Sequence, residues 1–396
     1  MRKISLPENV ELIINRLNAH GYRADVVGGA IRDLYIGRPA GDYDITTAAP
    51  PEKIKEIFSD LRTIDTGIKH GTVTVHIDGE NYEVTTYRRD GEYKDARHPE
   101  SVEFTTRLED DLSRRDFTIN AICYNHNDGV TDIFGGCADI DARIVRTVGV
   151  AEARFSEDAL RILRALRFAS VLDFTIDKET SAAVHKLRAL LTLVSRERIY
   201  TEWYKLCSGR AAYRIIEEYK DVIAVFIPSL EGVCMPPEEP FLGADTQTRM
   251  LSLFAHLGSS EFDCAMHELK TDNKTREYGR AVLELYADFS PKNVYDALLA
   301  LSRYGEEAVG GTIALGRVMG KYGDKERELI ASALASGVPY KLSSLAISGR
   351  DLLALGYRGE RVGETLNRLL DLVMRGTCKN DREELLGAVA DLYNNT

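Results

Sequence analysis

Asp42 and Asp44 are separated by one residue in a stretch, residues 42–46, whose composition predicts a β-strand. Side chains alternate along a strand, so both carboxylates would point to the same side with their Cα atoms about 7 Å apart. Two like charges held this close are costly unless a cation lies between them. Mg²⁺ binds a few carboxylates together with substrate phosphates, and two such ions can activate a hydroxyl and steady a leaving diphosphate. Taken alone, the pattern is also typical of a polar strand edge.

Gly28 and Gly29 lie between a predicted strand, residues 24–27, and a predicted helix that stops at Gly37. Glycine has no Cβ, so the backbone can approach a ligand closely, and the helix N-terminus offers N–H groups to a phosphate. Arg32, one turn into that helix, would grip a triphosphate oxygen through two N–H groups. A Gly-Gly pair is often an ordinary turn, but here it shortly precedes the two aspartates. Together the two patterns favour a phosphate site beside a metal site.

Glu83 lies in a predicted hairpin formed by residues 72–77 and 82–87 around Asp78 and Gly79. It would bind metal, orient an attacking hydroxyl, or simply form an ion pair with a neighbouring cation on an exposed strand. Residues 89–100 follow the hairpin and are polar and turn-rich, which predicts a mobile loop.

Asp158 and Arg161 are three residues apart in a segment, residues 156–170, that predicts a helix, so we expect them to share a face. Arg164 and Arg167 continue that stripe. A carboxylate accepts from an exocyclic amino group and a guanidinium donates to a ring nitrogen, which matches cytosine and adenine but mismatches uracil and guanine. Each unpaired buried group costs about 1–3 kcal/mol. The alternative is an ion pair followed by solvated arginines.

The composition of the 396 residues, 44% hydrophobic and 29% charged, is that of an ordinary globular protein with two to four domains. No apolar run is long enough for a bilayer and none resembles a secretory signal, so we expect a cytoplasmic protein. Six cysteines without a C-x-x-C pair indicate neither a zinc site nor a disulfide framework. The net charge of −11 disfavours a nucleic-acid partner, yet residues 141–220 hold 15 Lys/Arg against 11 Asp/Glu.

The order of predicted elements indicates an α+β fold. Strand signals end near residue 140, and helices follow, with a proline-rich break at residues 228–240. We expect a small N-terminal head with a mixed sheet and helices, followed by an elongated all-α neck, body and tail. The expected domains are residues 1–140 (head with the metal site), 141–206 (neck with the nucleotide-selecting helix), 207–280 (body) and 281–396 (tail).

Several segments together resemble one family. They are GGAIRDLYIGRPAGDYDITT (28–47), RRDFTINAI (114–122), EDALRILRALRF (157–168), SRERIYTEWYKL (195–206) and a tail segment (347–373). These resemble the polymerase-β-type nucleotidyltransferase superfamily, in the form used by class II CCA-adding enzymes and bacterial poly(A) polymerases. The segments occur in the right order over most of the chain.

The resemblance implies roles for particular residues. Asp158 and Arg161 would act as a protein template, and Arg164 and Arg167 would contact the nucleotide or shape its pocket. In the RRD segment, Arg115 and Asp116 would approach the ribose and phosphates.

The resemblance also implies an activity and partners. We expect CCA addition to the 3′ end of tRNA from CTP and ATP with Mg²⁺, without a nucleic-acid template, and with the tail contributing to tRNA binding; a homodimer is also considered. The loop at 89–100 and the stretch GTVTV (71–75) resemble the CCA-adding form more than the poly(A) form. The alternatives are an enzyme restricted to adding A, a poly(A) polymerase, or a non-catalytic RNA-binding relative.

Overall fold

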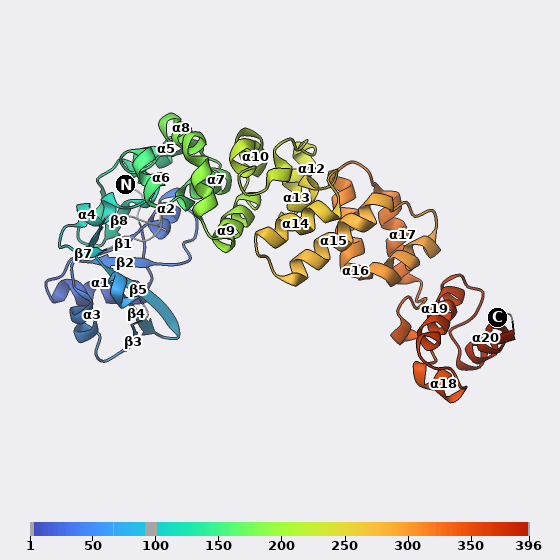
Figure 1. Cartoon of the computed structure of the whole chain (residues 1–396). Helices are drawn as coiled ribbons and strands as arrows, with labels where there is room; N and C mark the ends of the chain where they lie inside the picture. Colours follow the sequence, from blue (N-terminus) through green and yellow to red (C-terminus); the bar gives the residue numbers. More distant parts are fainter. Residues whose placement is uncertain (1–3, 66, 92–100, 395–396) are drawn as a thin grey trace. The chain divides into compact units, whose positions relative to one another are not determined.

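The computed structural model describes residues 4–65, 67–91 and 101–394, with side chains up to residue 390. The chain forms two compact units, Met1–Glu231 and Gly232–Thr396 (Figure 1). The boundary falls in the proline-rich break expected at residues 228–240. The predicted division at residues 140, 206 and 280 is finer than these two units and stays a prediction.

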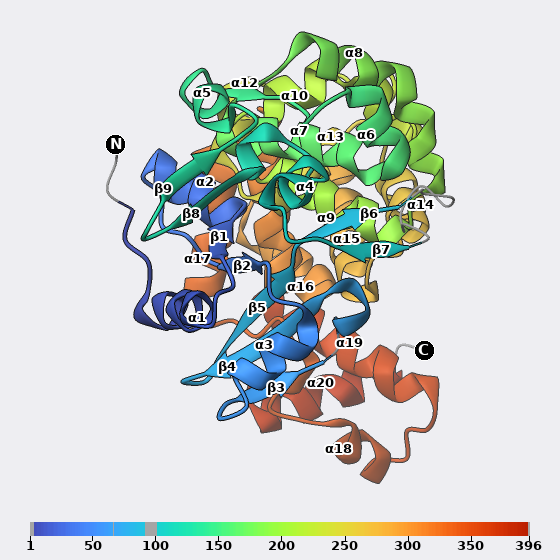
Figure 2. The same cartoon turned by 90° about the vertical axis from the view of Figure 1, so that its left-hand side faces the viewer.

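The first unit is built on a seven-stranded sheet with the order β3-β4-β5-β2-β1-β8-β9 (Figure 2). Strands β2 and β5 are parallel, and all other neighbours in this sheet are antiparallel. Its strands are β1 (Ala24–Val27), β2 (Asp44–Thr47), β3 (Arg62–Ile64), β4 (Thr72–Ile77), β5 (Glu80–Thr86), β8 (Ile122–Asn125) and β9 (Gly129–Asp132). Two small two-stranded sheets join β6 (Arg88–Asp90) with β7 (Val102–Phe104), and β10 (Ile144–Val145) with β11 (Thr175–Ile176).

In the first unit, helices pack against the sheet and against one another. α1 and α3 pack together and against β1, β4 and β5, whereas Leu108 and Leu112 of α4 pack with Val27 of β1. The helices are α1 (Glu8–Ala19), α2 (Gly29–Ile36), α3 (Pro51–Ile57), α4 (Leu108–Ser113), α5 (Gly136–Asp141), α6 (Ala151–Glu157), α7 (Leu160–Leu172), α8 (Lys178–Leu187), α9 (Arg196–Cys207), α10 (Ala212–Glu218) and α11 (Lys220–Ile223). Short 3₁₀ turns are η1 (Ile68–His70), η2 (Thr118–Asn120), η3 (Arg188–Leu193) and η4 (Pro228–Leu230).

Several local predictions are confirmed. Strand β1 covers residues 24–27, α2 ends at Gly37 in the left-handed conformation (φ 86°), and the hairpin β4–β5 turns at Asp78 and Gly79. Both turn residues have positive φ, 50° and 85°, as a two-residue hairpin turn of this type requires.

The expected strand at residues 42–46 is wrong at its start, because β2 begins only at Asp44. The antiparallel partner β1 ends at Val27, opposite Asp44, and then turns away at Gly28. Asp42 therefore has no partner on β1 and lies outside the strand. The expected loop at 89–100 is also wrong at its start, since Arg89 and Asp90 belong to β6; residues 92–100 lie outside the described residues.

The expected continuous helix at 156–170 is interrupted at Asp158. Helix α6 ends at Glu157, Asp158 is extended (φ −138°, ψ 103°), and α7 begins at Leu160. The Asp158 carboxylate accepts the backbone N–H of Leu160 at 3.1 Å, a local bond that competes with helical continuation. Asp158 and Arg161 thus do not share one helix face, and that expectation is wrong.

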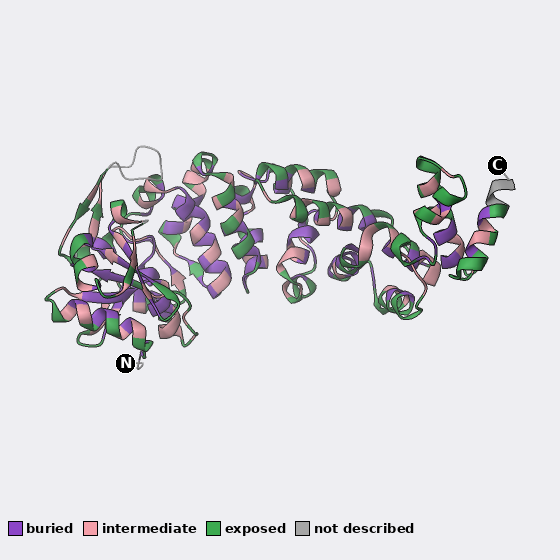
Figure 3. Ribbon diagram, turned by 90° about the horizontal axis from the view of Figure 1, so that it is seen from below, coloured by how far each residue is buried: buried purple, intermediate pink, exposed green. Residues whose placement is uncertain are grey.

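All the regular secondary structure described in the second unit is helical, including the 3₁₀ turn η5 (Leu342–Ser344). Its α-helices are α12 (Glu238–Gly243), α13 (Thr246–Leu253), α14 (Ser259–Glu268), α15 (Asn273–Asp288), α16 (Val294–Val318, bent at Gly305), α17 (Asp324–Ala335), α18 (Gly349–Ala354), α19 (Glu360–Met374) and α20 (Arg382–Asn394). Figure 3 shows buried positions along the sheet strands and on one side of most helices. The mixed sheet with helices followed by an all-helical region confirms the predicted fold class. Every helix in the described part of the chain is too short or too polar to cross a bilayer.

Candidate active site

Asp42 and Asp44 lie at the end of the sheet where β2 begins. The side chain of Asp44 reaches solvent, but the surrounding protein removes part of its hydration, and this burial raises its pKa above the ordinary value. Arg115 opposes that rise, and the charge of Asp42 adds to it. The two carboxylates are therefore close enough to repel one another, and the site carries negative charge that would attract a cation.

Arg115 packs directly over the Gly28 turn. Gly28 has a φ of 79°, and a Cβ there would lie 3.3 Å from Nη1 of Arg115, so only glycine leaves the guanidinium its place without strain. Asp111 faces Nη2 of Arg115 at 3.4 Å. The Nε–H of Arg115 is buried and lacks a hydrogen-bond partner among the described residues. An unsatisfied buried donor is costly, and it is suited to an anionic oxygen that arrives with a ligand.

Arg32 is buried on α2 and already engaged. Its Nε and Nη2 each donate to Asp33 at 2.9 Å, and its Nη1 donates to Asn120 at 2.7 Å. In this structure the two N–H groups of Arg32 that were expected to bind a phosphate thus bind the carboxylate of Asp33. A Cβ on Gly29 would meet Nη2 of Arg32 at 3.6 Å, an ordinary contact, so Gly29 is less constrained than Gly28.

Asp116 connects the head to α7. One oxygen accepts from the backbone of Phe117 (2.8 Å) and from Asn120 (3.0 Å), and the other accepts from Nε of Arg164 (2.7 Å). Burial alone would raise the pKa of Asp116, but the charge of Arg164 and these hydrogen bonds outweigh it and lower the pKa to about 2. Asp116 is therefore a fixed anion in a buried network.

Asp158 lies at the break between α6 and α7, Arg161 lies in the first turn of α7, and the two side chains have separate partners. Asp158 pairs with Nη2 of Arg198 on α9 at 3.0 Å. Arg161 is buried and donates to Glu157 at 2.6 Å, to the backbone oxygen of Arg114 at 3.0 Å and to that of Arg154 at 3.1 Å. Both side chains are thus oriented by the protein.

Arg164 and Arg167 share the buried carboxylate of Glu202 on α9. Nε of Arg167 lies 2.7 Å from Oε2 of Glu202, and Nη1 of Arg164 lies 3.9 Å from Oε1. Burial lowers the pKa of Arg167 to about 10, although Glu202 opposes this. A cluster of arginines thus faces the same region as Arg32 and Asp116.

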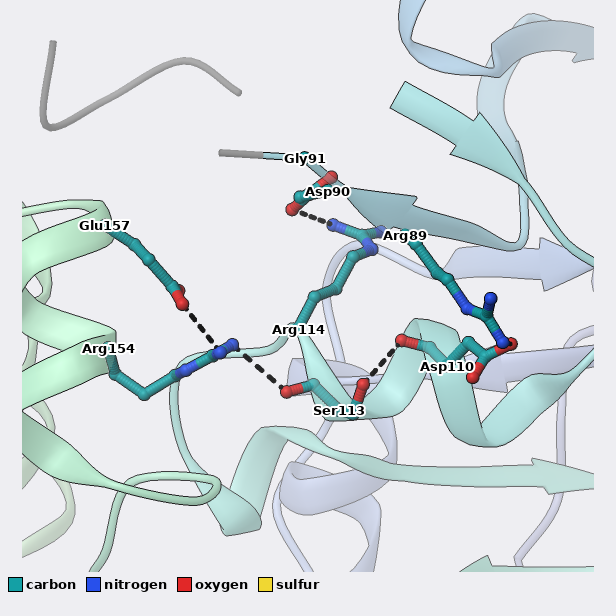
Figure 4. Close-up of a pocket in the computed structure, with 8 residues that line it drawn as sticks. All are labelled: Arg89, Asp90, Gly91, Asp110, Ser113, Arg114, Arg154 and Glu157. Carbon is teal, nitrogen blue, oxygen red and sulfur yellow. Dashed lines mark hydrogen bonds and ion pairs between the residues drawn. The ribbon is translucent and has the colours of Figure 1, made fainter. Parts of the chain in front are cut away.

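A pocket of about 250 Å³ adjoins this region (Figure 4). Figure 4 shows Arg154 between Glu157 and Ser113 on one side, with Arg114 directed at Asp90. The pocket is lined by Arg89, Asp90, Gly91, Asp110, Ser113, Arg114, Arg154 and Glu157. Neither Asp42 nor Asp44 lines the pocket, whereas Glu157, the partner of Arg161, does, so the pocket adjoins the Arg161 end of the site.

Glu83 is exposed on β5, opposite Thr74 of β4. The register pairs Thr46 with Thr85, and Glu83 is two residues from Thr85, so strand alternation places Glu83 on the same face as Asp44. None of the influences that shift the pKa of Asp44 comes from Glu83. Its catalytic role stays a prediction.

Sequence reasoning missed several residues of the site. Four of them form a hydrogen bond or an ion pair with a predicted site residue: Asp111, Asn120, Arg198 and Glu202. The four-residue spacing from Asp111 to Arg115 was a local signal, and Arg198 and Glu202 lie in the segment 195–206 that resembles the family, but no spacing pointed to their partners on α7 or at the helix break. Within the described residues no group of three or more His, Cys, Asp or Glu side chains could hold a metal, so a cation would rely on two carboxylates and on substrate oxygens.

Comparison with known proteins identifies relatives. Residues 24–146 match the family described as the poly A polymerase head domain, and residues 173–230 match a probable RNA and SrmB-binding site of polymerase A. The chain is 38% identical to the CCA-adding enzyme of Geobacillus stearothermophilus over 387 residues, 94% of each chain. It is 36% identical to that of Lactobacillus helveticus over 392 residues, 96% of each.

Solved structures agree with these matches. The CCA-adding enzyme of Bacillus stearothermophilus in complex with CTP is 33% identical, with a TM-score of 0.79 over 98% of this chain and 97% of that one. The Thermotoga maritima CCA-adding enzyme complexed with tRNA has a TM-score of 0.68 over 98% and 96% of the two chains. At 20% identity, the second likeness concerns the fold alone.

Proposed function

Because this chain belongs to the class II CCA-adding enzyme family, with its poly(A) polymerase head, we propose that it adds C, C and A to the 3′ end of tRNA without a nucleic-acid template. The 3′-hydroxyl attacks the α-phosphorus of CTP twice and then of ATP, and diphosphate leaves. The observation that carries the proposal is the 38% identity to the Geobacillus enzyme across 94% of both chains, since it includes the head and the helical region.

The aspartate pair fits Mg²⁺. Asp42 and Asp44 supply the oxygen ligands that this ion prefers, and their mutual repulsion is relieved by a cation. When bound there, Mg²⁺ would lower the pKa of the attacking hydroxyl and neutralise charge on the triphosphate. Glu83, on the same face of the sheet, would orient the hydroxyl or add a ligand.

The phosphates are assigned to the Gly28 turn and to Arg115. The unsatisfied Nε–H of Arg115 would donate to a phosphate oxygen close to the aspartates. Gly28 and Gly29 let that oxygen approach the backbone at the start of α2. Arg32 and Asp116 would hold the turn and Arg164 in place, and Arg164 and Arg167 would contact the nucleotide.

Base selection is assigned to Asp158 and Arg161. The carboxylate would accept from the amino group of cytosine or adenine, and the guanidinium would donate to the adjacent ring nitrogen. Their contacts with Arg198 and Glu157 support this assignment, because a template must present its polar groups in fixed directions. The tail would bind tRNA by shape and backbone. The homodimer and the cytoplasmic location stay predictions.

The decisive experiment supplies tRNA that ends at its discriminator base. The protein is incubated with Mg²⁺ and each triphosphate, singly and together, and the products are sequenced. We expect addition of C, C and A in order, and no product from UTP or GTP. Incorporation of A alone would indicate an A-adding enzyme, long A tails a poly(A) polymerase, and absence of diphosphate release a non-catalytic RNA-binding protein. Asp42→Ala should abolish the signal; full activity of that variant would contradict the metal assignment.

A further inference from the structure

Phe168, at the centre of the site's arginine cluster, lies close to three guanidinium groups. Its ring centroid is 3.9 Å from Cζ of Arg167, 5.1 Å from that of Arg32 and 5.4 Å from that of Arg164. The ring is buried, with 6% of the residue exposed. Phe117, next to Asp116, meets it edge-on with centroids 5.6 Å apart. The ring therefore joins Arg32 of α2 and Phe117, which directly precedes η2, to two arginines of α7.

Three positive charges this close repel one another. Arg164 and Arg32 both lower the pKa of Arg167, which is the direction expected of neighbouring cations. The carboxylates of Asp33, Asp116 and Glu202 balance the charge, one for each arginine. Asp33 already orients Arg32 through two hydrogen bonds, whereas Arg164 and Arg167 each approach their carboxylate through one of its oxygens. The aromatic face adds a plane against which the guanidinium groups rest.

We propose that Phe168 is a positioning residue for nucleotide binding. Its ring holds Arg32, Arg164 and Arg167 in one arrangement through attraction to its negative face, and so prepares the arginine cluster before the triphosphate arrives. This inference rests on the proposed function of the site. It adds Phe168 to the residues of the nucleotide site. Phe168 has no polar side-chain atom, so it acts on the nucleotide only through the arginines.

The first test compares Phe168→Leu with Phe168→Tyr and with a matched control, Phe174→Leu. Phe174 is equally buried, at 4% exposed, follows α7, and has no guanidinium on its ring among the described contacts. CTP affinity is measured by calorimetry without tRNA, KM and kcat are measured with tRNA, and thermal stability is recorded for each variant.

We expect Phe168→Leu to weaken CTP binding and raise KM about tenfold, with kcat at saturating CTP within about threefold. Phe168→Tyr, which keeps an aromatic face, should stay within about twofold of the natural protein. Phe174→Leu should lose stability with CTP affinity unchanged. Equal CTP affinity in the two leucine variants, or a loss in Phe168→Tyr as large as in Phe168→Leu, would overturn the proposal.

A second test removes the electrostatic contribution and keeps the shape. Phenylalanines with one, two and three ring fluorines are introduced at position 168, which progressively weakens the negative potential of the face. CTP affinity should fall stepwise with fluorination, and a constant affinity would refute the inference.

If the natural protein binds CTP but does not extend tRNA, the proposed activity fails and the binding series still tests Phe168. If tRNA is extended normally by every variant at low CTP, only the role of Phe168 fails.

Discussion

The buried pair of Asp116 and Arg164 should be a measurable source of stability in the first unit. Their side-chain atoms are 2.6–2.7 Å apart, and Asp116 is 8% exposed. Its pKa falls from 3.8 to about 2 in the folded protein. One pKa unit corresponds to about 1.4 kcal/mol, so the lowered pKa of Asp116 contributes about 2.5 kcal/mol to the free energy of unfolding at neutral pH. Because the folded pKa is depressed, the contribution is present above pH 3.8 and is lost as the pH falls towards 2.

The perturbations are Asp116→Asn, Arg164→Met and the double variant. Asp116→Asn should lower the free energy of unfolding by about 2.5–4 kcal/mol at pH 7, because it also leaves Arg164 with only the longer contact to Glu202. The difference from the natural protein should shrink by about 1 kcal/mol at pH 3, where the carboxyl of Asp116 is mostly protonated in the unfolded chain but still ionised in the folded protein. The double variant should lose about 1–3 kcal/mol less than the two single losses added together.

Trp203 makes the assay specific to the first unit. It is the chain's one tryptophan, is fully buried on α9, and lies within Met1–Glu231. Urea unfolding followed by its fluorescence therefore reports on that unit. Asp60→Asn, which breaks the exposed pair with Arg16, is the matched control and should change the midpoint only slightly. Additive single losses, or a difference independent of pH, would refute the reasoning.

Four further predictions concern the site. Asp44→Asn should lower kcat at least about a thousandfold in a diphosphate-release assay, with CTP still bound, whereas appreciable turnover would exclude Asp44 as a metal ligand. Arg115→Met removes the charge that lowers the pKa of Asp44, so the acid limb of the kcat/KM profile should move to higher pH; an unmoved limb contradicts this. Arg161→Ala should reduce the preference for CTP over UTP by about 10- to 100-fold, more than it weakens triphosphate binding, and unchanged selectivity would refute the template role. Gly28→Ala should raise the KM for CTP, because its Cβ displaces Arg115, whereas Gly37→Ala, equally strained at φ 86° but with open space around its Cβ, should only lose stability; equal KM values contradict the steric argument.

Features set by short-range chemistry could be predicted from the sequence. The Asp78–Gly79 turn and the glycine at the end of α2 are positions where positive φ is required, and residues of the right type mark them. The resemblance gave the order of the segments along the chain. The start of β2 was missed because it depends on where the partner strand β1 ends, which the residues before Asp44 do not encode.

The contacts that fix the site could not be predicted, because they join distant positions. Asp116 and Arg164 are 48 residues apart, and Asp158 and Arg198 are 40 apart. Helical periodicity around residue 158 favoured a continuous helix, yet the Asp158 carboxylate accepts from the backbone of Leu160 at the start of α7 and from Arg198 on α9. An aspartate inside a helical pattern is itself a signal, since Asp favours helix ends over helix interiors.

The remaining hydrogen-bonding capacity of Asp158 and Arg161, to which we assign base selection, matches what cytosine and adenine need. The two Asp158 oxygens have about four acceptor positions, of which Leu160 and Arg198 occupy two. Arg161 has five donors, of which Glu157 and two backbone oxygens occupy three. A spare acceptor and a spare donor therefore remain while the contacts that orient each side chain stay in place. An ionised carboxylate only accepts and a guanidinium only donates, so the pair cannot exchange roles to suit uracil or guanine. Because the protein already holds both groups, selection would require no rearrangement of the pair itself, and discrimination would come from the unpaired groups that a wrong base leaves behind.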